Sequence, residues 1–91
     1  MRLKDKIAIV TGGGSGFGIG ICEKFSQEGA KVIVADINLS SAKEIAKDIN
    51  GTAIEVDVSD SKSMKSFSEK VFSEFGKIDI LVNNAGVTHL P

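Results

Sequence analysis

The sequence has little of two residues that often carry chemistry: it contains one cysteine, Cys22, and one histidine, His89. A single thiol cannot close an internal disulfide, and one thiol with one imidazole is too small a set for a zinc site. We therefore expect no disulfide framework and no metal held by side chains. Cys22 lies on an apolar stripe with helical spacing, where we interpret it as a core residue rather than a reactive thiol.

Long apolar runs and a strong charge of one sign are also absent. No stretch approaches the roughly 18 apolar residues of a membrane span, and the short apolar run before the first glycines is too brief for a signal peptide. The formal net charge is -1, and the basic residues are scattered among acidic ones. The sequence thus predicts a cytoplasmic location and neither a membrane nor a nucleic acid partner.

What is present is an ordinary globular composition with a regular order of segments. Apolar residues make up 42% of the chain and charged residues 25%, and 91 residues suffice for one small domain. Short runs rich in β-branched residues predict strands, and apolar residues three to four apart predict helices. The predicted strands are residues 6–10, 31–35, 52–56 and 78–82, and the predicted helices are residues 18–27, 41–49 and 59–75.

Strict alternation of strands and helices predicts an α/β fold with a parallel sheet. Right-handed crossovers then predict the strand order 3-2-1-4, with the first two helices on one face. This arrangement is the first half of a Rossmann-like doubly wound sheet. The spacing of Ser41 and Glu44 predicts a capping box at the start of the second helix, with Asn50 and Gly51 at its end.

A glycine-rich segment connects the first strand to the first helix. Residues 11–18 read TGGGSGFG, with five glycines in eight positions. A loop without side chains that leads into a helix N-terminus suits a phosphate group, because free N–H groups and the helix dipole favour negative charge. The spacing is TGxxxGxG rather than the shorter GxGxxG fingerprint, so the turn is longer.

Acidic and amide residues follow the other strands: Asp36, Asp57 and residues 83–84. An aspartate at a strand end is often only a turn residue, but ligands of doubly wound sheets bind at this edge. Asp36 lies 20 residues after Gly16, near the spacing at which an acid meets the adenosine ribose. A carboxylate there accepts hydrogen bonds from both ribose hydroxyls and repels a 2′-phosphate, so we expect NAD to be preferred over NADP.

Together, TGGGSGFG, Asp36, Asp57-Val58 and NNAG at residues 83–86 resemble the short-chain dehydrogenase/reductase family over nearly the whole chain. The resemblance implies that Asp57 accepts a hydrogen bond from the adenine amino group while the Val58 backbone recognises the adenine ring. It assigns chiefly structural roles to Thr11 and Asn83. The residues implied to wrap the pyrophosphate are Gly12, Ser15, Gly16, Phe17 and Gly18, and those implied to line the nicotinamide-side ribose are Asn84, Ala85 and Gly86.

The chain departs from the family in its catalytic residues. Family members share a catalytic Asn, Ser, Tyr and Lys, whereas this sequence has no tyrosine and stops just past NNAG. We therefore assign no catalytic residue, His89 included. We expect residues 1–91 to be a partial dinucleotide-binding domain: the N-terminal NAD-binding half of an oxidoreductase that transfers hydride between NAD(H) and an alcohol/carbonyl substrate.

Two other interpretations stay open: a non-catalytic dinucleotide-binding module, and a structural interaction domain in which the glycines form only a turn. In each case the apolar strand at residues 78–82 would be an unpaired sheet edge. Such edges invite strand addition, so we expect the chain to self-associate.

Overall fold

The computed structural model describes residues 2–14 and 16–84, so Ser15, Ala85 and Gly86 of the expected site lie outside the described residues. The strands form one parallel sheet of order β3-β2-β1-β4, which confirms the predicted α/β class and strand order. The strands are β1 (Ile7–Thr11), β2 (Lys31–Asp36), β3 (Thr52–Glu55) and β4 (Ile80–Asn83), and the helices are α1 (Gly16–Gln27), α2 (Leu39–Ile49) and α3 (Ser61–Phe75).

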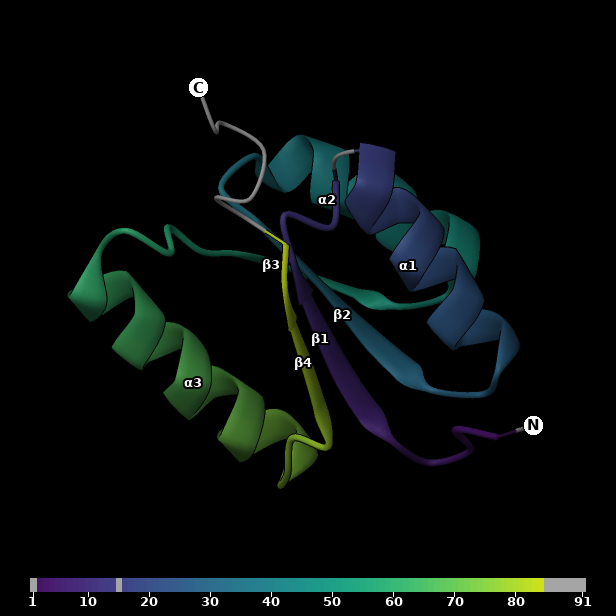
Figure 1. The fold of residues 1–91 in the computed structure, drawn as a ribbon. Helices are drawn as coiled ribbons and strands as arrows, with labels where there is room; N and C mark the ends of the chain where they lie inside the picture. Colours follow the sequence, from purple (N-terminus) through teal and green to yellow (C-terminus); the bar gives the residue numbers. More distant parts are fainter. Residues whose placement is uncertain (1, 15, 85–91) are drawn as a thin grey trace.

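The sheet lies between two helical layers. Helices α1 and α2 cover one face and α3 covers the other (Figure 1). Neighbouring residues of a strand point to opposite faces, so Ile9 joins a core cluster with Phe67 and Val71 of α3, while Val10 joins one with Cys22 of α1. Because both faces are covered, β1 is buried over its whole length.

The helix starts differ from the sequence prediction. The Asn38 side chain accepts a hydrogen bond from the Ser41 N–H at 3.2 Å, so α2 begins at Leu39, and the predicted capping box at Ser41 is wrong. An asparagine at the N-cap that accepts a hydrogen bond from the N–H three residues further along satisfies one of the N–H groups that have no partner within the helix. Asp60 likewise caps α3, which begins at Ser61 rather than at residue 59.

The ends of α2 and α3 agree with the prediction, and the start of α1 and the end of β1 differ from it by one or two residues. Asn50 ends α2 in the left-handed conformation, as expected, and Gly76 ends α3 in the same way. Helix α1 begins at Gly16 rather than at residue 18, and β1 extends one residue further than expected, to Thr11.

Hydrogen bonds join the residue before β4 to the first residue of β1. The Asp79 carboxylate accepts the Ile7 N–H at 2.8 Å, the Asp79 N–H donates to the Ile7 carbonyl at 2.9 Å, and Lys77 lies 3.1 Å from the carboxylate. The Ile7 hydrogen bond, with Lys77 beside it, lowers the pKa of Asp79. These contacts set the register that brings Asn83 beside Thr11 at the other end of the two strands.

Candidate functional site

The carboxyl ends of β1 and β4 are joined by side-chain hydrogen bonds. The Thr11 hydroxyl lies 3.2 Å from the Val82 carbonyl oxygen and 3.1 Å from Asn83 Oδ1. The amide of Asn84, which is buried, donates to the Gly12 carbonyl at 3.2 Å. The end of β4 therefore holds the start of the glycine loop, in agreement with the structural roles expected of Thr11 and Asn83.

Two glycines of residues 11–18, one in the loop and one in α1, are required by the protein's own backbone conformation and packing. Gly12 has a φ of 66°, a conformation that costs residues with a Cβ about 1–2 kcal/mol. A Cβ on Gly18 would overlap the Gly12 carbonyl oxygen and lie 2.7 Å from the Gly13 Cα. Helix α1 can approach the loop this closely only because residue 18 has no side chain.

Gly16 is different, because the protein does not require it. A Cβ built there would meet no heavy atom within 4 Å, so the missing side chain leaves open space at the first residue of α1. The first turn of this helix has no acidic residue. A helix N-terminus with free space and no acidic residue in its first turn suits an anion, so this part of the site fits a pyrophosphate.

Asp36, at the end of β2, lies against the same loop. Its Oδ2 accepts the Gly14 N–H at 3.0 Å, and its Oδ1 accepts the Asn38 N–H at 2.9 Å. An ionised carboxylate offers about four lone-pair sites, so each oxygen keeps capacity for a further donor. The half-buried carboxylate is thus held in one orientation next to the loop and can still accept two hydroxyl groups.

Asp57 has a clear local role. Its Oδ1 accepts hydrogen bonds from the Ser59 hydroxyl at 2.6 Å and the Ser59 N–H at 3.0 Å, which lower the pKa of Asp57. Its own N–H donates to the Ser63 hydroxyl at 2.9 Å. These bonds shape the connection from β3 to α3 and leave Val58 partly exposed.

Residues at this edge that the sequence analysis missed are Gly14 and Ile37. Gly14 supplies the N–H that holds Asp36, and the bond joins two segments 22 residues apart, so no local pattern indicates it. Ile37 follows Asp36 with 63% of its surface exposed. Phe17, at 79% exposure, is a second exposed apolar side chain near the loop.

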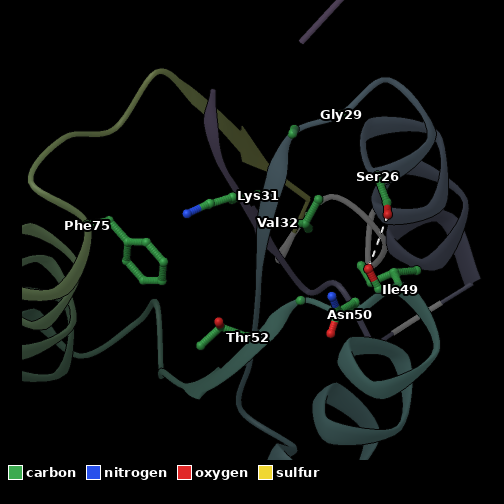
Figure 2. Close-up of a pocket in the computed structure, with 10 residues that line it drawn as sticks. Ser26, Gly29, Lys31, Val32, Ile49, Asn50, Thr52 and Phe75 are labelled. Carbon is green, nitrogen blue, oxygen red and sulfur yellow. Dashed lines mark hydrogen bonds between the residues drawn. The ribbon is translucent and has the colours of Figure 1, made fainter. Parts of the chain in front are cut away.

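A hollow of about 430 Å³ lies at the opposite edge of the sheet, where β2 and β3 begin (Figure 2). Lys31 and Phe75 lie on one side of it, and Ser26 and Asn50 lie on the other. The Ser26 hydroxyl donates to the Ile49 carbonyl at 3.2 Å, which connects α1 to α2. None of the residues predicted for the site lines this hollow.

The described part of the chain shows neither a metal-binding cluster nor a membrane-spanning helix. Residues 2–14 and 16–84 contain no group of three His, Cys, Asp or Glu side chains that could hold a metal ion. Within the same ranges, none of the helices combines the length and the apolar character needed to cross a membrane.

A parallel sheet of order 3-2-1-4, with a glycine loop and an aspartate at its carboxyl edge, defines a Rossmann-like nucleotide-binding half-fold. Comparison with known proteins then identifies the family. A profile of the short chain dehydrogenases matches residues 6–91, and the chain belongs to this family of oxidoreductases.

Individual relatives agree with this assignment. The chain is 44% identical to galactitol 2-dehydrogenase of Agrobacterium fabrum over 96% of its own length and 35% of the relative's. It is 41% identical to the 3-oxoacyl-[acyl-carrier-protein] reductase FabG of Thermotoga maritima, covering 97% of this chain and 38% of that one.

A 3-ketoacyl-(acyl-carrier-protein) reductase of Brucella melitensis, solved in complex with NADH, superposes with a TM-score of 0.90 at 42% identity, over 98% of this chain and 37% of the reductase. The chain therefore spans little more than a third of the length of these relatives.

Proposed function

We propose that residues 1–91 form a partial dinucleotide-binding domain that binds NAD and is the N-terminal part of an oxidoreductase acting on an alcohol/carbonyl pair. The observation that carries the proposal is the Asp36 carboxylate, held beside the glycine loop by the Gly14 N–H at 3.0 Å. A fixed acceptor next to an open helix N-terminus offers one place for a ribose and one for a pyrophosphate.

Each part of the cofactor has a candidate contact. The N-terminus of α1 and the glycine loop would receive the pyrophosphate, and Asp36 would accept from the ribose hydroxyls. Asp57 and Val58 would meet the adenine. The residues proposed for the pyrophosphate are Gly12, Ser15, Gly16, Phe17 and Gly18, and those proposed for the nicotinamide-side ribose are Asn84, Ala85 and Gly86.

Charge favours NAD over NADP in this arrangement. Two negative charges about 4 Å apart repel by about 4 kcal/mol at a dielectric constant of about 20, and the half-exposed position of Asp36 reduces this by screening. A remaining difference of about 1.4–3 kcal/mol corresponds to a preference for NAD of about ten- to a hundredfold.

The relatives support the redox part of the proposal. The superposed reductase of Brucella melitensis was solved with NADH, and the dehydrogenase of Agrobacterium fabrum bears the name of a polyol. Bound nicotinamide accepts or donates the hydride, and the residues of this chain bind and orient the cofactor. Because the 91 residues include no tyrosine to serve as the family's acid/base, we expect binding without turnover.

Isothermal titration of the chain with NAD and with NADP tests the proposal. We expect NAD to bind at least about tenfold more tightly than NADP, and Asp36→Ala to abolish the difference. Asp48→Ala is the matched control, since Asp48 is an exposed aspartate of α2 remote from the glycine loop in the sequence and should leave the preference unchanged. Equal affinities in the unmodified chain would contradict NAD selectivity, and absence of binding would refute cofactor binding by residues 1–91.

We also propose that a second copy of the chain pairs with the free edge of β4. Among the described residues β4 pairs only with β1, and Leu81 on this strand is 58% exposed. Sedimentation velocity should show dimers or larger species that Leu81→Lys converts to monomers, because a lysine on an edge strand opposes pairing. A monomeric unmodified chain would refute this proposal.

The cytoplasmic location stays a prediction.

A further inference from the structure

Gly14 lies close to both the Asp36 side chain and the start of helix α2. A Cβ built on this residue would lie 2.9 Å from Asp36 Oδ2, 2.9 Å from the Ser41 Cβ and 3.3 Å from the Ala42 nitrogen. Ordinary contacts of a Cβ begin at 3.4 Å. Two of the three neighbours belong to the first turns of α2, while the third is the end of a side chain that can rotate.

The same residue fixes the orientation of that side chain. The Gly14 N–H donates to Asp36 Oδ2 at 3.0 Å, while the Asn38 N–H donates to Oδ1 at 2.9 Å. One donor on each oxygen resists rotation of the carboxylate, and a hydrogen bond to a charged group is among the stronger ones. Any side chain at position 14 would press on Oδ2 and weaken the bond that holds it.

We propose that Gly14 is a positioning residue for cofactor preference: its N–H and its lack of a side chain hold the Asp36 carboxylate in the orientation that discriminates between NAD and NADP. The inference rests on the proposed NAD site. It adds that the discrimination depends on a loop residue which itself carries no charge.

The test compares the ratio of NAD to NADP affinity in Gly14→Ala with that in Gly20→Ala, by isothermal titration of the full chain. A Cβ on Gly20 meets no heavy atom within 4 Å, so this control adds the same methyl group without contact. We expect Gly14→Ala to lower the ratio about tenfold and Gly20→Ala to leave it unchanged. A change in both affinities by the same factor would indicate general damage to the loop and would overturn the inference.

Two further variants separate positioning from misfolding. In the Asp36→Ala background, Gly14→Ala should not change the ratio, because no carboxylate remains to be positioned. Ser41→Gly removes one of the contacts at 2.9 Å, so Gly14→Ala/Ser41→Gly should recover part of the lost preference. A ratio that does not recover, or that still changes without Asp36, would refute the role of Gly14.

A readout without cofactor keeps this inference distinct from the proposed function. In the amide NMR spectrum of the free chain, Asp36→Asn should shift the Gly14 proton resonance strongly and the Gly20 resonance little. If the unmodified chain prefers NAD through Asp36 but Gly14→Ala keeps that preference, the proposed function stands and the role of Gly14 is wrong. If the chain binds neither nucleotide, the proposed function fails and takes the role of Gly14 with it.

Discussion

Two glycines of the same helix should respond to alanine in opposite directions. A Cβ on Gly18 would overlap the Gly12 carbonyl oxygen and lie 2.7 Å from the Gly13 Cα, whereas a Cβ on Gly20 meets no heavy atom within 4 Å. The atoms opposite Gly18 belong to the backbone of the glycine loop, which cannot rotate away as a side chain can. We therefore expect Gly18→Ala to destabilise the chain and Gly20→Ala to stabilise it.

The expected magnitudes follow from these contacts. Overpacking costs about 1–3 kcal/mol, and a clash with backbone belongs near the upper end of that range. Alanine in place of glycine inside a helix contributes about 1 kcal/mol at either position. The free energies of unfolding of the two variants should thus differ by about 3 kcal/mol, which for a domain of this size separates their melting temperatures by at least about 10 °C.

Unfolding has to be followed by far-UV circular dichroism, because the chain has neither tryptophan nor tyrosine to report by fluorescence. Thermal and urea transitions of the unmodified chain and both variants supply the comparison. A Gly18→Ala variant that melts at or above the temperature of the unmodified chain would refute the close approach of α1 to the loop. Equal losses in the two variants would also refute it, since only one position has a neighbour.

Three further predictions concern groups away from the loop contact. The pKa of Asp79 is lowered by its bond to the Ile7 N–H, so the contribution of this bond to stability is present at neutral pH and is lost as the pH falls below about 4. Asp79→Asn should therefore reduce the fall in the free energy of unfolding below about pH 4, measured by urea titrations. An unchanged fall would contradict this. Thr11→Val should cost about 0.5–1.5 kcal/mol in urea unfolding, because the hydrogen bond from the buried Thr11 to the Val82 carbonyl is lost, and an unchanged midpoint would contradict the bond. Burial, with a smaller effect of Glu23, raises the pKa of Cys22 to about 11. Mass spectrometry should therefore show slow alkylation of this thiol at about pH 8 in the native chain and fast alkylation in urea. Fast alkylation of the native chain would disprove the burial.

The overall architecture could be predicted from the sequence because it depends on local patterns and on chirality. Each strand is a short apolar run and each helix shows apolar spacing, and right-handed crossovers leave few orders for four parallel strands. Helix starts were harder, since several neighbouring residues can cap. Asn38, Ser41 and Asp60 all have capping side chains, and only the structure shows that Asn38 and Asp60 are the ones used.

The candidate site was predictable only in part. The strand ends pointed to Asp36 and Asn84, because the carboxyl ends of parallel strands share one edge. The contacts that hold these residues could not be foreseen. The bonds from Gly14 to Asp36 and from Asn84 to Gly12 span 22 and 72 residues, and their geometry depends on how the loop and two strands pack.

The position of β1 in the sheet has a consequence for the time course of folding. Its pairing with β2 joins residues 24 positions apart, Ile7 with Lys31, whereas its pairing with β4 joins Ala8 with Ile80, 72 positions apart. Closing the longer segment loses more chain entropy, so we expect it to be the slower step. The bonds of Thr11 and Gly12 to the end of β4 can form only then. We therefore expect the glycine loop, although it is synthesised before β4, to reach its final shape late, so that a nascent chain without β4 would have an incomplete binding edge.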